Sequence, residues 1–250
     1  MRSISFMSRG ETLRGYVHEA CESGPAPVIV MCHGFTGNCS EHGLFDDFGE
    51  AAAKAGYHVI RFDCAGSGAS DGDFAKLTSL DGWVSDMRAA MDYVQTEDEI
   101  KPAGFITMGI SMGAATALLT SEDARVKAAV GIAPVIYPRE TFVKIFSVEK
   151  WEELRAGRNV HCEYAGSEFD AAPVFLDAAE SLSVEKVLAS TQKPVLLRFG
   201  TEDEVIGRDT ARRVQGAAFA NVRVDIVEGE DHGCMQHEDE NIAAILDFLG

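Results

Sequence analysis

Features that would place the chain in a special structural class are missing from its sequence. No run of eighteen or more apolar residues is present, so we expect no membrane-spanning helix. The six cysteines show no paired C-x-x-C spacing, and we expect all of them to be reduced thiols in a cytoplasmic protein. Residues 1–10 lack the basic, apolar and small-residue order of a secretory signal. Neither an internal repeat nor a low-complexity stretch occurs, so an ordinary globular chain is favoured.

Positive charge is scarce as well. Lys and Arg number 22 against 40 Asp and Glu, which gives a formal net charge of −18. Such a chain repels nucleic acid and anionic membranes, so we expect neither as a partner. The acidic residues are spread along the chain, which is typical of a solvated surface. With 250 residues the chain can bury a large core without disulfide or metal staples.

The sequence does contain a regular alternation of short apolar runs and helical patterns. Continuous apolar runs such as 27–32 are typical of strands buried on both faces of a parallel sheet. Residues 80–95 carry apolar side chains at helical spacing. The alternation predicts an α/β fold, with a mostly parallel central sheet and helices on both faces. The expected strands are 4–7, 13–20, 27–32, 58–63, 104–110, 126–132, 194–199 and 222–227, and the expected helices are 44–55, 80–95, 112–121, 208–218 and 241–249.

The alternation breaks after Ala133 and Pro134. Residues from about 135 to 190 are rich in aromatic and charged side chains, and the segment is too long for an ordinary connection. Such insertions are usually lids. We therefore expect a single domain over residues 1–250, with a lid inserted at about 135–190 after the sixth strand of the main sheet.

The strongest chemical signal is a G-x-S-x-G sequence at residues 109–113, which lies between an apolar strand and an Ala-rich helix. In this context the serine occupies a tight strand-to-helix turn, and the residues two before and two after it must be small. The turn places Ser111 at a helix N-terminus, whose partial positive charge favours a developing oxyanion. We predict that Ser111 is a nucleophile. The alternative is a Gly-rich junction without chemistry.

The loop after the apolar run 27–32 is suited to bind an oxyanion. Acyl transfer needs two preorganised backbone donors. The N–H of Met112, directly after the nucleophile, supplies one, and the N–H of Phe35 is the natural second donor. Gly34 lets the backbone come close to a substrate. His33 precedes the nucleophile in the chain, and we expect it to hold this loop by hydrogen bonding rather than to act as the base.

An acid and a histidine should follow the serine along the chain, each after a strand. After the strand at 194–199, Asp203 competes with Glu202 and Glu204, and we favour Asp203 because the short acid in this turn must point back to the histidine. After the strand at 222–227, His232 lies in a loop bordered by glycines. Its rival, His237, belongs to the start of the closing helix. The predicted triad is Ser111, Asp203 and His232.

Residues 231–237 could also suggest a metal site, since they include Asp231, His232, Cys234 and His237. Their spacing matches none of the common zinc patterns, and no second Cys or His pair completes four ligands. We therefore predict no metal and no cofactor.

Together these segments resemble the bacterial cinnamoyl (feruloyl) esterase group of α/β-hydrolases, which is a serine aminopeptidase-like group. The resemblance rests on residues 33–37 (HGFTG), 61–63 with 66–72, 109–113, and 193–196 leading to Gly200 and Asp203. It runs over nearly the whole chain and implies the α/β-hydrolase fold with a lid in the same place. It also implies a serine carboxylic-ester hydrolase that forms an acyl-enzyme on small acyl or hydroxycinnamoyl-type esters.

Two departures from that group flank the serine. The group commonly has His before the nucleophile and Gln after it, whereas this chain has Ile110 and Met112. Met112 offers its backbone N–H whatever its side chain, but the wall of the acyl pocket is expected to differ. Candidates for stacking on substrate in the lid are Tyr137, Trp151, Phe169 and Phe175, which are equally well explained as lid core.

Other functions remain open at this point. A serine peptidase of the aminopeptidase type could anchor a substrate amine on the lid pair Glu152 and Glu153, which is more simply a solvated helix face. An acyl thioesterase uses the same fold. A non-catalytic sensor module normally lacks one triad member, and all three are present here. The partner we expect is a small-molecule ester, and the sequence leaves a monomer and a homodimer open.

Overall fold

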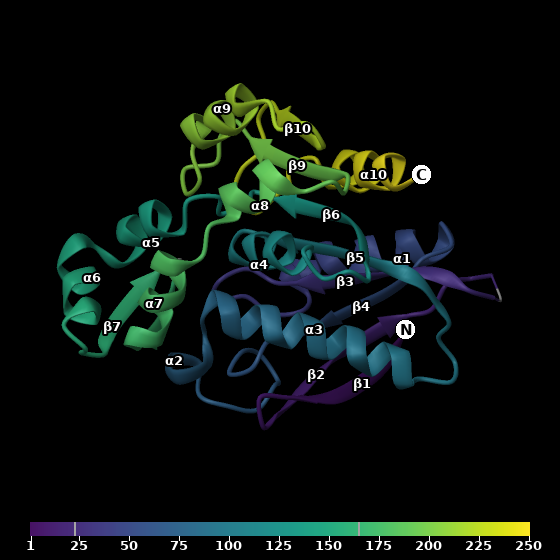
Figure 1. The fold of residues 1–250 in the computed structure, drawn as a ribbon, viewed down its shortest axis with the longest axis horizontal. Helices are drawn as coiled ribbons and strands as arrows, with labels where there is room; N and C mark the ends of the chain where they lie inside the picture. The colour runs from purple at the N-terminus through teal and green to yellow at the C-terminus, as the bar shows by residue number, and fades with distance from the viewer. Residues whose placement is uncertain (23, 165) are drawn as a thin grey trace.

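The computed structural model describes residues 1–22, 24–164 and 166–250. Its main feature is an eight-stranded sheet in the order β1-β2-β4-β3-β5-β6-β9-β10 (Figure 1). The first two strands form an antiparallel hairpin, β2 runs antiparallel to β4, and all the remaining neighbours are parallel. The strands are β1 (Arg2–Ser8), β2 (Glu11–His18), β3 (Ala26–Cys32), β4 (His58–Phe62), β5 (Pro102–Ile110), β6 (Val126–Ile132), β9 (Val195–Gly200) and β10 (Val222–Val227).

Helices cover both faces of this sheet, because its central strands carry apolar side chains on both sides. All five residues of β4 and six of the seven in β3 are buried. Helices α3 and α4 pack together on one face, whereas α1 and α10 pack together on the other (Figure 1). The helices of the main body are α1 (Leu44–Lys54), α2 (Phe74–Leu77), α3 (Leu80–Thr96), α4 (Met112–Thr120), α9 (Arg208–Ala217) and α10 (Glu238–Leu249), with a short 3-10 turn η1 (Glu41–Gly43). The predicted fold class is confirmed.

A separate group of elements lies between β6 and β9, where the alternation of the sequence breaks. Its helices α5 to α7 and its hairpin project beyond the carboxyl ends of the parallel strands, at the left of Figure 1, whereas α8 packs beside α4 on the main body. A small antiparallel hairpin, which the sequence patterns did not predict, lies among its helices. Its elements are α5 (Pro138–Phe146), α6 (Val148–Arg155), β7 (Val160–Tyr164), β8 (Ser167–Ala171), α7 (Pro173–Ser181) and α8 (Val184–Ser190). This group therefore overlies the sheet edge to which the predicted site residues belong.

None of the helices in the described part of the chain has the length and apolarity that crossing a lipid bilayer requires.

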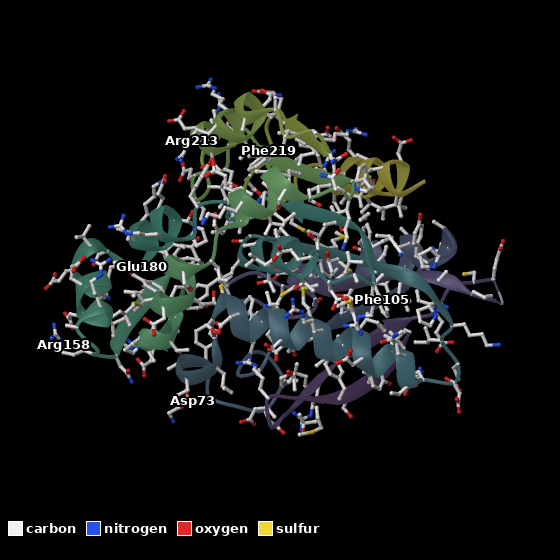
Figure 2. The ribbon with its side chains drawn as sticks, viewed as in Figure 1. Asp73, Phe105, Arg158, Glu180, Arg213 and Phe219 are labelled. Carbon is white, nitrogen blue, oxygen red and sulfur yellow. The ribbon has the colours of Figure 1, made fainter. Side chains whose placement is uncertain are left out.

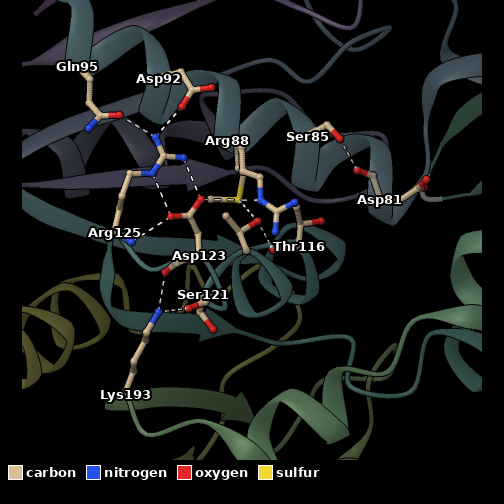
Figure 3. Close-up of polar contacts among 12 residues, drawn as sticks. Asp81, Ser85, Arg88, Asp92, Gln95, Thr116, Ser121, Asp123, Arg125 and Lys193 are labelled. Atoms are coloured by element: carbon tan, nitrogen blue, oxygen red, sulfur yellow. Dashed lines mark hydrogen bonds and ion pairs between the residues drawn. The ribbon is translucent and has the colours of Figure 1, made fainter.

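A polar junction fastens the end of the sheet opposite to this group (Figure 3). Arg125, just before β6, binds both oxygens of Asp123 through Nε and Nη2, at 3.0 and 2.9 Å. Its Nη1 reaches Asp92 on α3 at 2.6 Å. Lys193, which precedes β9, donates to the backbone carbonyls of Ser121 and Asp123. One ion-pair cluster thus connects α3, the end of α4 and the starts of two strands.

The junction predicts a pH dependence of stability. The Arg125 guanidinium lowers the pKa of Asp123 to about 2 from its usual 3.8. A carboxyl group with a lowered folded-state pKa contributes stability above its unfolded pKa, and that contribution is lost as the pH falls through the folded value. We expect Asp123→Asn to lower the free energy of unfolding by about 2 kcal/mol at pH 6. The deficit should shrink between pH 4 and about pH 2, as measured by urea denaturation across that range.

Asp92→Asn is the matched control, because Asp92 pairs with the same guanidinium but is largely exposed. Its effect should stay below about 1 kcal/mol. A deficit for Asp123→Asn that is the same at pH 6 and pH 3 would contradict the assignment.

Candidate active site

Ser111 sits on a sharp turn between β5 and α4. Its backbone adopts φ 55° and ψ −118°, a left-handed conformation that residues other than glycine rarely take. The turn is held on both sides, since the Ser111 N–H donates to the carbonyl of Ile132 and its own carbonyl accepts from Val135. Such strain persists only where the surroundings impose it. The turn raises the serine hydroxyl above the carboxyl ends of the strands.

Two glycines make this turn possible. A Cβ at Gly113 would lie 2.1 and 2.2 Å from the carbonyl oxygens of Cys32 and His33. A Cβ at Gly109 would lie 2.3 Å from the backbone of Gly113. The small residues that flank the serine are therefore required by backbone-to-backbone contact. The same contact brings the start of α4 against the end of β3.

A continuous chain of hydrogen bonds joins three of the predicted residues. His232 Nε2 lies 3.0 Å from Ser111 Oγ, and His232 Nδ1 lies 2.9 Å from Asp203 Oδ2. The other oxygen of Asp203 accepts the backbone N–H groups of Val205 and Ile206, each at 2.9 Å. Asp203 is buried, with 4% of its surface exposed. A buried acceptor on Nδ1 leaves Nε2 free to accept a proton from the serine.

The rival residues of the sequence lie away from this chain. Glu202 and Glu204 are exposed, and Glu202 pairs with Arg208. His237 precedes α10, and its backbone N–H donates to Glu230. In the described residues no three Asp, Glu, His or Cys side chains form a group that could hold a metal ion.

Glu230 is a residue that the sequence reasoning missed. Its buried carboxylate accepts the backbone N–H groups of Asp231, Gln236 and His237 and the side-chain amide of Asn241. These four contacts fix the loop that carries His232. A glutamate between a strand and a histidine loop could have indicated this role, but two other acids, Glu228 and Asp231, lie beside it in the sequence.

The two predicted oxyanion donors lie on either side of Ser111. Met112 is the first residue of α4, so its N–H has no acceptor within the helix. Phe35 follows Gly34, where a Cβ would lie 3.6 Å from Ser111 Cβ. No acceptor for either N–H occurs among the residues that the structure describes. Both donors are therefore free to bind a substrate oxygen.

His33 forms hydrogen bonds within the loop after β3 and does not contact Ser111 Oγ. Its Nε2 accepts the backbone N–H of Cys64 at 3.0 Å, so the proton of the neutral ring is on Nδ1. Nδ1 lies 2.8 Å from the carbonyl oxygen of Gly34 and donates to it. The ring is completely buried.

A cavity of about 250 Å³ opens over Ser111 and His232. Its lid-side wall is formed by Ile145, Tyr164 and Ser167. A neighbouring cavity of about 420 Å³ shares Thr36, Gly37 and Ser167 with it and is lined by Phe169. No sequence pattern marks Ile145 or Tyr164, because only the path of the inserted segment brings them here.

Three of the four lid candidates lie outside both cavities. Trp151 is buried and donates from Nε1 to Glu180. Phe175 is buried among other aromatic rings. Tyr137 lies under the guanidinium of Arg213, 3.6 Å from its ring centroid. Of the four, the structure brings only Phe169 next to the site.

The inserted segment between β6 and β9 packs on the side chain of Phe35. This ring makes edge contacts with Phe169 and Phe142, at centroid distances of 4.9 and 5.4 Å, and tilted contacts with Phe146 and Phe175. All five rings are buried. The residue predicted to offer the second oxyanion donor is thus also the point at which the inserted segment packs on the body. Figure 2 shows side chains such as Glu180 and Arg158 on the inserted segment and Phe105 on the body.

The sheet order and the serine on its strand-to-helix turn define an α/β-hydrolase. Residues 23–171 match the family described as serine aminopeptidase, S33, and the chain belongs to this hydrolase family.

Relatives and solved structures agree with this placement. Rv2307c, an uncharacterized protein of Mycobacterium tuberculosis, is 26% identical over 89% of this chain and 69% of its own length. Est1E of Butyrivibrio proteoclasticus with bound ferulic acid superimposes with a TM-score of 0.78 at 22% identity, covering 98% of this chain and 97% of Est1E. An esterase of Pyrococcus furiosus gives a TM-score of 0.72 at 18% identity, over 99% of this chain and 90% of that chain. At these identities the structures show the shared fold alone.

The turn can be tested through its glycines. Gly113→Ala places a methyl group against two carbonyl oxygens that belong to backbone and cannot rotate away. We expect a loss of at least about 2 kcal/mol in the free energy of unfolding, because overpacking here must shift α4 or β3. Denaturant unfolding followed by circular dichroism measures it. Gly216→Ala is the control: it lies in α9 with open space around it, and should stabilise by about 0.5–1 kcal/mol. Equal effects at the two positions would contradict the packing argument.

Proposed function

We propose that this hydrolase cleaves carboxylic esters with Ser111 as nucleophile, His232 as base and Asp203 as the acid that orients the histidine. The observation that carries the proposal is the unbroken hydrogen-bond chain from Ser111 Oγ to the buried Asp203 carboxylate. The strained turn and the two free N–H groups beside it support the same reaction.

Each group has a definite part in the reaction. His232 Nε2 takes the proton of Ser111 as Oγ bonds to the carbonyl carbon of the ester. The negative charge moves to the carbonyl oxygen, where the N–H groups of Phe35 and Met112 stabilise it. His232 then gives its proton to the leaving oxygen, and the alcohol departs. Water, deprotonated by the same histidine, attacks the acyl-enzyme and releases the acid and the free serine.

Asp203 keeps the imidazole in the useful orientation throughout. Its carboxylate accepts a hydrogen bond from the Nδ1–H group of His232 and stabilises the imidazolium that forms twice in each cycle. The two backbone donors at Val205 and Ile206 keep the second oxygen fixed. The carboxylate therefore keeps its orientation while the proton moves between serine, histidine and leaving group.

We further propose small acyl or aromatic esters, including hydroxycinnamoyl types, as substrates. The cavity over Ser111 holds about 250 Å³, and it shares the lining residues Thr36, Gly37 and Ser167 with the cavity of about 420 Å³ beside Phe169. Two adjacent cavities of this size suit an ester in which a short acyl group is joined to a flat or extended group. The likeness in fold to Est1E, solved with ferulic acid, supports this class of substrate.

A peptidase is the second candidate, and the family description favours it. The acidic pair considered as an amine anchor does not support it, since Glu152 is paired with Arg155 on α6 and Glu153 with Arg158 just after that helix. Neither glutamate lines the cavity over Ser111. Turnover of aminoacyl p-nitroanilides above that of esters would favour the peptidase.

The ester proposal is tested on Ser111 itself. Ser111→Ala should lower kcat for p-nitrophenyl acetate by at least about 10⁴-fold and abolish labelling by a fluorophosphonate, because it removes the hydroxyl that is hydrogen-bonded to His232 Nε2. Glu204→Gln, an exposed acid next to Asp203, should stay within about threefold of the unmodified enzyme. An enzyme that hydrolyses none of p-nitrophenyl acetate, p-nitrophenyl butyrate and methyl ferulate would refute the proposal.

A further inference from the structure

A glutamate that takes no part in the triad reaches into the active-site cavity. Glu41 lies in η1, and its Oε1 accepts the backbone N–H of Gly34 at 2.6 Å. The same oxygen is pressed against Gly37, where a Cβ would lie only 2.3 Å from it. Burial raises the pKa of the Glu41 carboxyl, and His33, the Gly34 N–H and the two histidines His42 and His232 act in the opposite direction.

The backbone around Glu41 has a strained conformation that directs the Glu41 side chain towards Gly34. Glu41 has φ 46° and His42 has φ 57°, so two consecutive residues other than glycine are left-handed. Two hydrogen bonds to the Ser40 carbonyl, from the N–H groups of Gly43 and Phe45, close this turn. Conformations of this kind cost free energy and concentrate at functional sites. Here the strained turn delivers a carboxylate to one backbone N–H of the oxyanion loop.

That N–H belongs to one of the two peptide groups that flank the Cα of Gly34. Glu41 holds the peptide group between His33 and Gly34 through its N–H. The next peptide group, between Gly34 and Phe35, is held at its carbonyl by His33 Nδ1 at 2.8 Å and by the Gly37 N–H at 3.0 Å. Because C=O and N–H point in opposite directions in a trans peptide, this second group directs the Phe35 N–H away from His33.

Fixing both peptide groups fixes the rotation about Gly34. Glycine has the widest range of backbone angles, so the loop has no intrinsic preference for the useful one. A Cβ at Gly34 would also lie close to Ser111, at 3.6 Å from its Cβ, so a bulkier residue would stand at the substrate's side of the cavity. The loop keeps a small residue and depends on side chains from elsewhere to hold it.

We propose that Glu41 is a positioning residue of the oxyanion hole: its carboxylate, together with the His33 imidazole, holds the two peptide groups around Gly34 so that the Phe35 N–H faces the substrate oxygen. This inference rests on the proposed serine-hydrolase function. It makes the acceptor oxygen of residue 41 the important group, rather than its negative charge.

The test compares Glu41→Ala, which removes the acceptor, with Glu41→Gln, which keeps an oxygen in its place. We expect Glu41→Ala to lower kcat for p-nitrophenyl acetate by about 10- to 100-fold with KM changed less than about threefold, since a misdirected donor weakens binding of the oxyanion more than that of the substrate. Glu41→Gln should recover at least a third of kcat. Glu50→Ala, an exposed glutamate on α1, is the control for loss of one acidic side chain.

A second variant disturbs the contact between Glu41 and the Gly34 N–H by changing a residue on the opposite side of the Glu41 carboxylate. Gly37→Ala brings a methyl group onto Glu41 Oε1 and should lower kcat by a similar factor without altering residue 41. Melting temperatures of all variants, followed by circular dichroism, separate loss of alignment from loss of fold. If Glu41→Ala unfolds, Glu41→Gln and Gly37→Ala still decide the matter, because the proposal requires the first to be active and the second to be impaired.

The rate of fluorophosphonate labelling gives a readout that needs no knowledge of the substrate. In this reaction Ser111 Oγ bonds to phosphorus, fluoride leaves, the serine proton goes to His232, and the phosphoryl oxygen occupies the oxyanion hole. Absence of labelling in the unmodified protein would refute the proposed function. Labelling at equal rates in the unmodified protein and in Glu41→Ala would refute only the role of Glu41. Equal losses in Glu41→Gln and Glu41→Ala, or a change confined to KM, would also overturn it, because either result assigns the effect to charge or to substrate binding.

Discussion

The contact between Gly113 and the carbonyl oxygens of Cys32 and His33 is the constraint on which the site depends. It brings the start of α4 directly against the end of β3. The turn at Ser111 and the loop after β3, which are far apart in the chain, therefore lie side by side. The strained backbone of Ser111 follows from this contact, since the chain must turn sharply to enter α4. The loop after β3 is thereby placed beside the serine before any side chain of the site contributes.

The remaining site groups are held by buried acids with several backbone partners each. Asp203 binds two N–H groups besides His232, and Glu230 binds three in the loop that carries the histidine. Hydrogen bonds from backbone to a carboxylate are charge-assisted and directional, so they hold loops that lack regular structure. The chain carries far more acidic than basic residues, and a few of these acids act as internal organisers rather than as surface charge.

Local sequence patterns predict those elements of the fold whose structure depends on interactions between residues close together in the chain. The strand–turn–helix around Ser111 could be predicted because small residues at 109 and 113 are required by sterics within a few residues. The central strands β3, β4 and β9 could be predicted because burial on both faces demands continuous apolar runs. The hairpin β7–β8 and the cavity residues Ile145 and Tyr164 could not, since their positions result from how a long insertion packs on the body.

The aromatic residues of the inserted segment show a second limit of prediction from sequence. Composition indicates that rings such as Trp151 and Phe175 are important, but it cannot distinguish packing from contact with substrate. In the structure these two rings are buried in the lid. Glu41 was missed for a related reason: its contact with Gly34 depends on two left-handed residues that no sequence rule would place there.

The packing of the inserted segment on Phe35 has a consequence for how such an enzyme can diversify. Four buried phenylalanine rings of that segment contact the buried ring of Phe35, so exchanging the whole segment for another would disturb the loop after β3 as well as the cavity. Ile145, Tyr164 and Ser167 face the cavity without belonging to that cluster. Substitutions at these few wall positions are therefore the simplest way to change specificity, in evolution or by directed mutagenesis. They leave the cluster of phenylalanine rings around Phe35 intact.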